Sequence, residues 1–192
     1  MVSNVIALAS RLPDEELLAA ARRGEEEACA ALFLRHNAML NRLAVRLLGR
    51  HADVDDLVQE SFVQALSSIK RLPDADATGS WLATVMVRTA HKILRRQRLM
   101  TRLGLRRYNE IDVDQFVSPN APTEAVVELR MLYSAFERMP AQERIALMLK
   151  RVQGCNVDEI GALMGLSRAT VNRRLSAAES RLRDWVRPRG ES

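Results

Sequence analysis

Apolar residues recur with the spacing of an α-helix along almost the whole chain, and this periodicity constrains the fold more than any other feature. The one long interruption lies between Thr101 and Pro122, where glycine, proline and asparagine occur without an apolar period. Only 4% of the residues are aromatic, a composition that favours helices over strands. The pattern predicts an all-α protein of two small helical domains, residues 1–100 and 123–192, joined by a flexible linker, residues 101–122.

Turn and capping residues divide the two halves into helices with short connections. Helices are expected over about residues 14–23, 25–48, 53–70, 81–99, 123–139, 140–152, 157–164 and 168–187. Ser80 is the expected N-cap of the helix at 81–99, and Asn156 with Glu159 has the pattern of a capping box. The helix at 157–164, a turn at Gly165–Ser167 and the long last helix have the arrangement of a helix-turn-helix.

Composition excludes several classes of function. The net charge of +5 favours a polyanionic partner, and the distribution of charge must distinguish this from a merely soluble basic domain. Cys29, Cys155 and the scattered histidines have neither disulfide nor zinc-ligand spacing, so no metal or cofactor is expected. Because the chain has no phosphate-binding loop and no nucleophile motif, an enzyme is not expected. No signal peptide or long apolar segment is visible, which predicts a cytoplasmic protein without membrane insertion.

The last helix has the pattern of a DNA-recognition helix. Its apolar stripe should pack on the preceding helix, which leaves Arg173 on the opposite face among Asn172 and small side chains. This combination suits the major groove, because arginine and asparagine can each pair bidentately with a base edge. Arg168 and Arg174 flank the face at positions suited to phosphates. The alternative is a solvated basic face on a helix that only packs.

A second basic element lies in the first half of the chain, where residues 79–109 contain no aspartate or glutamate. Its basic residues are Arg88, Lys92, Arg95, Arg96, Arg98, Arg102, Arg106 and Arg107. They lie on and beyond the helix that contains Trp81, and they favour a second contact with a nucleic-acid backbone. Trp81 itself is expected in the core, the alternative being a platform on which a flipped base stacks.

The helix at 53–70 carries the opposite charge. Its apolar stripe should face the core, while Asp53, Asp56 and Glu60 lie on the opposite face, with Gln59 nearby. An acidic face is usually only solvated. In a chain otherwise suited to a polyanion such a face would repel DNA, so a basic protein surface is the better partner for it.

Four segments, in this order along the chain, resemble the extracytoplasmic-function (ECF) sigma factors. Residues 53–62 resemble the polymerase-binding motif of that family, and Trp81–Leu82 with the basic helix that follows resembles its −10 helix. Met139–Arg144 is similar to the motif that opens its second DNA-binding domain, and residues 158–171 are similar to its helix-turn-helix. The resemblance implies a sigma factor that binds core RNA polymerase and promoter DNA and directs transcription initiation, with an anti-sigma factor as a further partner.

The resemblance also implies a role for each site residue. The polymerase-binding residues are Asp53, Asp56, Leu57, Gln59 and Glu60. The residues for the −10 region are Ser80, Trp81, Arg88, Lys92, Arg95 and Arg96. The residues for the −35 region are Arg168, Thr170, Asn172, Arg173, Arg174, Ser176 and Ala177. Arg88, Lys92 and Ala177 differ from the residues frequent in the family, which leaves the promoter sequence open.

The alternative function is a stand-alone helix-turn-helix transcription regulator that binds DNA as a dimer. Residues 1–100 would then have to form a sensor or dimerisation domain, and the acidic helix and the basic helix after Trp81 argue against that. Cys155, which follows Gly154 in a turn, is expected to be a small half-buried hydrophobe, the alternative being a redox sensor.

Overall fold

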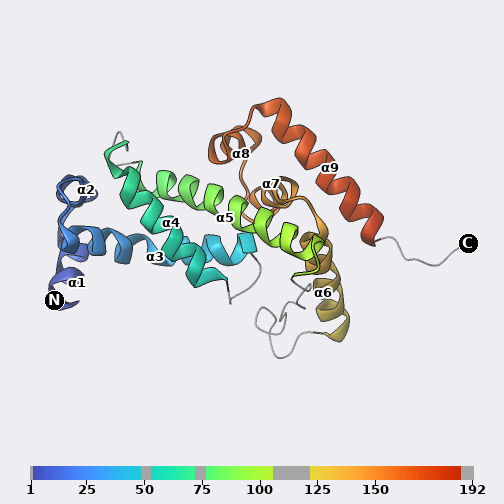
Figure 1. Cartoon of the computed structure of the whole chain (residues 1–192), viewed down its shortest axis with the longest axis horizontal. Coiled ribbons are helices and arrows are strands. Elements are labelled where there is room, and N and C mark those ends of the chain that lie inside the picture. The colour runs from blue at the N-terminus through green and yellow to red at the C-terminus, as the bar shows by residue number, and fades with distance from the viewer. Residues whose placement is uncertain (1, 49–52, 72–76, 106–121, 187–192) are drawn as a thin grey trace, which may run out of the picture. The chain divides into compact units, whose positions relative to one another are not determined.

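The computed structural model describes residues 2–48, 53–71, 77–105 and 122–186, and all regular secondary structure in these ranges is helical (Figure 1). The predicted all-α class is therefore confirmed for this part of the chain. The chain divides into two compact units, Met1–Ala90 and His91–Ser192. Most of the predicted linker, residues 106–121, lies outside the described residues, so the predicted domain limits stay predictions.

The first unit is built from helices of very different length. Its elements are α1 (Val2–Arg11), α2 (Asp14–Arg22), α3 (Glu26–Leu48), α4 (Val54–Ser68), the 3-10 turn η1 (Ile69–Arg71) and the N-terminal part of α5 (Thr78–Arg102). Only α1 falls outside the predicted helices, and no acidic residue marks its first turn. The predicted cap at Ser80 is wrong: α5 begins earlier, and the Ser80 hydroxyl donates to the carbonyl of Ala77 at 2.9 Å.

The core of the first unit forms where α2 meets α3. Leu17 of α2 and Ala31 of α3 are completely buried there, and Cys29 packs half-buried against the same cluster. Trp81 also packs against this cluster and is half-buried, as expected for a core residue. The rings of α3 and α4 meet in an edge-to-face contact between Phe33 and Phe62, whose centroids are 4.8 Å apart.

Arg35 of α3 ties α1 and α2 to the core of the first unit. Its guanidinium donates to the carbonyl of Ala9 from Nε at 3.1 Å and from Nη2 at 2.6 Å. It also donates to the carbonyl of Leu12 and to the carboxylate of Asp14, the first residue of α2. These bonds satisfy carbonyls at the end of α1 that have no partner inside a helix, so α1 is fixed to α3 by polar as well as apolar contacts.

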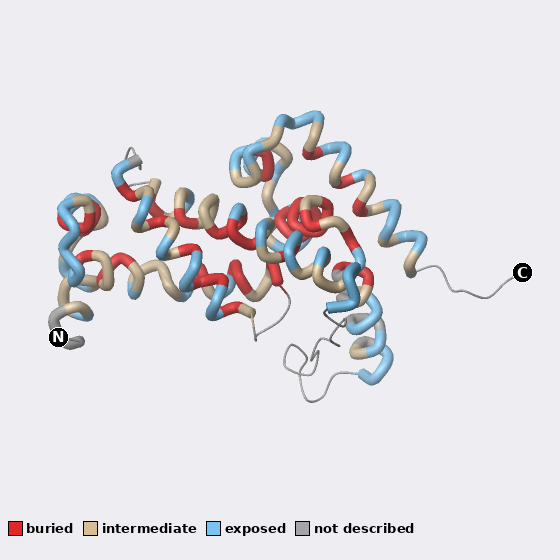
Figure 2. Tube along the Cα trace, in the orientation of Figure 1, coloured by how far each residue is buried: buried red, intermediate tan, exposed pale blue. Residues whose placement is uncertain are grey.

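The second unit contains four helices of the described chain after α5. They are α6 (Thr123–Arg138), α7 (Ala141–Arg151), α8 (Val157–Met164) and α9 (Arg168–Val186). Helix α7 is the central one, since most of its residues are buried, whereas buried and exposed residues alternate along α9 (Figure 2). Even Glu143 of α7 is only 4% exposed, and its carboxylate accepts a bond of 2.8 Å from Arg181 of α9.

Helices α8 and α9 are joined by a short turn, an arrangement consistent with the predicted helix-turn-helix. The capping box is present: the Asn156 side chain accepts from the backbone of Glu159, and the Glu159 side chain accepts from the backbone of Asn156. Gly165 ends α8 with φ of 66°, a left-handed conformation that favours glycine. A β-carbon at Gly161 would lie 2.8 Å from the carbonyl oxygen of Leu166, so only glycine fits where the turn passes over α8.

Candidate nucleic-acid and partner interfaces

The exposed face of α4 is acidic at its start and apolar further along. Asp56, Gln59 and Glu60 are exposed there as predicted. Asp53 precedes the helix and is half-buried. Leu57 is completely buried, so the structure does not place it at the surface with the other predicted polymerase-binding residues. Its position is one of the inward-facing ones of the helix.

Two residues of the α4 face do not appear among the sequence predictions. Asp55 is exposed beside Asp56 and doubles the negative charge of the first turn. Val63 is 65% exposed and adds an apolar side chain to this face. The exposure of Asp55 and of Val63 follows from the helical period, because residues 55, 56, 59, 60 and 63 share one side of a helix with 3.6 residues per turn.

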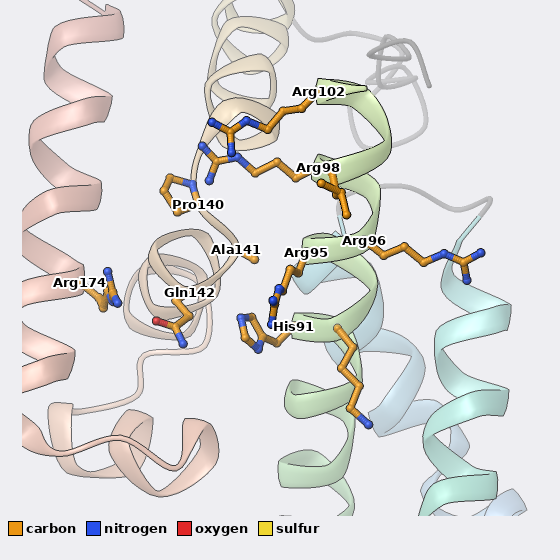
Figure 3. A pocket seen from close by; sticks show the side chains of 11 residues that line it. His91, Arg95, Arg96, Arg98, Arg102, Pro140, Ala141, Gln142 and Arg174 are labelled. Carbon is orange, nitrogen blue, oxygen red and sulfur yellow. The ribbon is translucent and has the colours of Figure 1, made fainter. Parts of the chain in front are cut away.

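The basic residues of α5 are exposed along much of the helix. Arg88, Lys92, Arg95 and Arg96 are all exposed, and so is Ser80 near the helix start. The arginines do not point in one direction: Figure 3 shows Arg95, Arg98 and Arg102 extending from one side of α5 and Arg96 from another. Arg106 and Arg107 lie outside the described residues. A helix with cations on several sides suits a phosphate backbone, which needs charge more than exact direction.

His91 lies among these cations without adding to their charge. Partial burial lowers the pKa of His91 below its usual value, and the neighbouring Arg95 lowers that pKa further. The imidazole is therefore neutral near pH 7, and the positive charge of α5 comes from arginine and lysine.

The outward face of α9 contains the predicted base-reading residues. Asn172, Arg173 and Ser176 are exposed, whereas Arg174 and Ala177 are half-buried. The Nε atom of Arg174 is buried, which leaves its guanidinium less accessible to a phosphate than the exposed Arg173. The apolar stripe behind them is buried as expected, since Val171 and Ala178 are both 0% exposed and Leu175 is 8% exposed.

The start of α9 is held by two polar contacts. Ser167 is the N-cap: its hydroxyl accepts from the backbone of Thr170 at 3.3 Å and lies 3.0 Å from the Thr170 hydroxyl. Thr170 thus serves the cap and is half-buried. Arg168, the first residue of α9, forms an ion pair with Asp158 of α8 in which Nη1 lies 2.8 Å from Oδ2. Asp158 is not among the predicted site residues, because the sequence does not show that the two side chains meet.

The second unit also has an apolar groove that the sequence reasoning did not find. Its volume is about 450 Å³. Its apolar lining consists of Leu132, Phe136, Leu147, Met148, Val152 and Leu182, from α6, α7 and α9. Arg183 and an ion pair of 2.8 Å between Arg151 and Glu179 lie at its edge. Val152, which lies just after α7 and lines the groove, is 46% exposed.

Other kinds of site find little support in the described ranges. Within those ranges, no three histidine, cysteine, aspartate or glutamate side chains gather as a metal site requires. No helix in the described parts of the chain is both long enough and apolar enough to cross a membrane. Partial burial raises the pKa of the Cys155 thiol, and Glu159 raises it further, so the thiolate that redox chemistry requires is disfavoured.

The helical units, with exposed basic residues on α5 and α9, are those of an all-α protein suited to binding nucleic acid. The model of the family described as ECF sigma factor matches residues 15–188. A similar protein is the ECF RNA polymerase sigma factor SigM of Mycobacterium tuberculosis, 30% identical over 170 residues that cover 88% of this chain and 82% of SigM. Another is the ECF RNA polymerase sigma-E factor of Haemophilus influenzae, 27% identical, with coverage of 94% and 99%. The chain belongs to the ECF sigma factor family.

Solved structures show the same fold. CnrH, solved in complex with the cytosolic domain of CnrY, is 24% identical, with a TM-score of 0.58 and coverage of 92% of this chain and 99% of CnrH. The sigma factor RpoE of Bartonella quintana, solved in complex with the anti-sigma factor NepR, is 20% identical, with a TM-score of 0.56 and coverage of 82% and 96%. Helix α1 precedes the residues that the family model matches.

Proposed function

We propose that this sigma factor binds core RNA polymerase through its first unit and reads promoter DNA with helices of both units, so that transcription begins at specific promoters. The observation that carries the proposal is the separation of charge among exposed helix faces, acidic on α4 and basic on α5 and α9. We assign polymerase binding and −10 recognition to residues 1–100, a linker to residues 101–122 and −35 recognition to residues 123–192. The role is one of binding without catalysis, in the cytoplasm, where bacterial transcription takes place.

The acidic face of α4 is the proposed contact with polymerase. Asp55, Asp56 and Glu60 would repel a phosphate backbone, whereas a basic protein surface would neutralise them. Val63 continues the same face with an exposed apolar side chain, so a partner helix that pairs with the acids can also cover it. An interface with an apolar centre and charged edges is the arrangement that stable protein contacts use.

The basic faces are the proposed contacts with the promoter. Arg88, Lys92 and Arg95 of α5 are exposed and suit the −10 region, where an opened strand presents its phosphates. Arg173 and Asn172 of α9 are exposed at the positions from which a recognition helix reaches base edges in the major groove. Trp81 is half-buried and packs against the core of the first unit, so we give it a supporting role beneath the −10 segment.

We also propose an anti-sigma factor as the inhibitory partner of this chain. Two proteins of the same fold were solved in complexes, CnrH with the cytosolic domain of CnrY and RpoE with the anti-sigma factor NepR. The apolar groove of the second unit is a surface that such a partner could cover, since an amphipathic helix can fill a groove of this kind. Arg151 and Arg183 at its edge favour a helix with acidic residues beside its apolar stripe.

The polymerase contact is tested by reversing charge on α4. Asp56→Arg with Glu60→Arg should abolish capture of core RNA polymerase in a pull-down, because both side chains are exposed and their loss leaves the core intact. The matched control is Glu15→Arg with Glu16→Arg, which makes the same change in charge on exposed positions of α2. Normal recovery of core enzyme by the α4 variant, with both proteins folded by circular dichroism, would contradict the proposal.

The stand-alone regulator is distinguished by DNA binding without polymerase. A sigma factor whose two basic elements lie on separate units should bind promoter DNA weakly and with little sequence preference until core enzyme fixes their spacing. Fluorescence anisotropy at near-physiological salt measures this. If the free chain bound one promoter about 1,000-fold tighter than scrambled DNA, the range of a self-sufficient specific binder, the regulator would be the better description.

A further inference from the structure

Asp158 and Arg168 connect the two helices of the helix-turn-helix at its exposed end. The Nη1 atom of Arg168 donates to both carboxylate oxygens of Asp158, at 2.8 Å to Oδ2 and 3.2 Å to Oδ1. The side chain of Arg168 is 69% exposed and that of Asp158 is 67% exposed, so the pair lies at the surface. Arg168 is the first residue of α9, next to the base-reading face that begins at Asn172. The pair therefore lies where the recognition helix approaches DNA.

The backbone of Asp158 is held firmly. The Asn156 side chain accepts from the Asp158 backbone at 2.9 Å, and the Glu159 side chain closes the capping box with a bond of 2.7 Å to the Asn156 backbone. The turn between the helices is fixed as well, since the backbone of Leu166 donates to the carbonyl of Gly161 at 2.9 Å. The Asp158 carboxylate is thus presented to Arg168 from a rigid support.

Arg168 occupies a position that is unfavourable for a cation without such a partner. The start of a helix carries a partial positive charge, and the first turn of α9 contains no acidic residue. A lone arginine side chain there would be repelled by the helix dipole and would sample many rotamers. The Asp158 carboxylate offsets this repulsion and restricts where the guanidinium lies.

The ion pair leaves part of the guanidinium available. Only Nη1 is engaged with Asp158, and among the described residues Nε and Nη2 of Arg168 have no hydrogen-bond partner. A guanidinium has five N–H donors in a planar fork, so its free edge can donate to a phosphate while Nη1 stays on the carboxylate. The pair with Asp158 and a contact with DNA can therefore exist together.

We propose that Asp158 is a positioning residue for DNA binding, which orients Arg168 toward a phosphate of the −35 element. This inference rests on the proposed function of α9. It predicts a change in DNA affinity opposite to the one that charge repulsion alone would give. A carboxylate close to DNA ordinarily weakens binding by repulsion, so its neutralisation should strengthen binding. If Asp158 orients Arg168, neutralising Asp158 weakens binding instead.

The test uses the full chain in a holoenzyme with core RNA polymerase. The probe is a promoter fragment that the wild-type holoenzyme selects from a random library, and affinity is measured by fluorescence anisotropy over a range of salt concentrations. Exposed ion pairs have small coupling energies, so Asp158→Asn should weaken binding by about two- to five-fold. Loss of one phosphate contact also makes the salt dependence less steep, by up to about 1 in the logarithmic slope. Asp158→Glu keeps the carboxylate and should restore most of the affinity.

Two further variants separate positioning from general effects. In an Arg168→Ala background, Asp158→Asn should no longer weaken binding, because there is no guanidinium left to orient. Glu25→Gln is the matched control: it breaks the exposed pair of 2.7 Å between Arg23 and Glu25 in the first unit, with the same change in net charge. It should leave DNA affinity at the wild-type value. Thermal unfolding of each variant checks that α8 remains folded.

The outcomes are distinct. Unchanged or tighter binding by Asp158→Asn would overturn the inference and leave the function of α9 intact. Equal weakening by Asp158→Asn with and without Arg168 would also overturn it, because the effect would then not pass through the guanidinium. If the selected fragments shared no −35 element, the proposed function of α9 would fail, and the inference with it.

Discussion

Gly161 offers a substitution in which two physical effects of opposite sign can be weighed from the structure. Alanine in place of glycine inside a helix gains about 1 kcal/mol of helix propensity. At Gly161, however, the new methyl group would lie 2.8 Å from the backbone oxygen of Leu166. Forcing an extra methyl group into a packed site typically costs about 1–3 kcal/mol. Subtracting the gain from the cost leaves an expected destabilisation by Gly161→Ala of about 0–2 kcal/mol, centred on about 1 kcal/mol.

The turn cannot move away from the methyl group at low cost. The backbone N–H groups of Gly165 and Leu166 both donate to the carbonyl of Gly161, so a shift of Leu166 lengthens bonds that end α8. Because the same turn sets the position of α9 on α8, Gly161→Ala should also reduce base discrimination at the −35 element. The loss of stability should lower the midpoint of thermal unfolding of the second unit by about 4–8 °C, as measured by circular dichroism.

Gly79 provides the matched control. It lies in the first turn of α5, and a β-carbon there would meet only ordinary contacts, the closest at 3.9 Å from atoms of His36 and Met39. Gly79→Ala should therefore be neutral or stabilising by up to about 1 kcal/mol. If Gly161→Ala were as stable as the wild type or more stable, the contact with Leu166 would not be the reason for glycine at this position.

Three further perturbations test other parts of the structure. Arg173→Ala should lose discrimination at one −35 base pair by about 1–3 kcal/mol, and an unchanged base preference in a holoenzyme promoter selection would contradict its assignment. Leu57→Ala should lower the free energy of unfolding of the first unit by about 2–5 kcal/mol in denaturant titration, because the side chain is completely buried, and a surface-like cost below about 0.5 kcal/mol would refute this. Burial lowers the pKa of His36 and of His91, so as pH falls the unfolded chain takes up protons before the folded chain does. The free energy of unfolding should therefore fall as pH drops below about 6.5. Replacing both histidines with asparagine should flatten this pH dependence.

Much of the fold follows from local patterns in the sequence. The capping box at Asn156 and the end of α8 at Gly165 can be predicted, because each depends on residues within one turn of each other. Helix α1 could not be predicted in the same way. It is held by contacts of Val5 and Leu8 with the core and by Arg35, which is distant in sequence.

The candidate site also contains some residues that the sequence predicts and others that it does not. The exposed acids of α4 and the exposed Arg173 follow from the helical period alone. Leu57 shows the limit of motif matching, since a motif contains residues that support a surface as well as those that form it. The pair of Asp158 and Arg168 is out of reach of sequence reasoning, because their contact depends on how two helices cross.

The anchoring of α1 by Arg35 has a consequence for any shortened form of the chain. A protein that lacks residues 1–12 would lose the carbonyl acceptors of Ala9 and Leu12 as well as the apolar face of the helix. The guanidinium of Arg35, whose side chain is only 23% exposed, would then keep Asp14 but lack its other partners. Because Val5, Leu8, Ala9 and Leu12 cover the apolar cluster of α2 and α3, truncation would open that cluster to water, and amides of α2 and α3 should exchange with solvent faster.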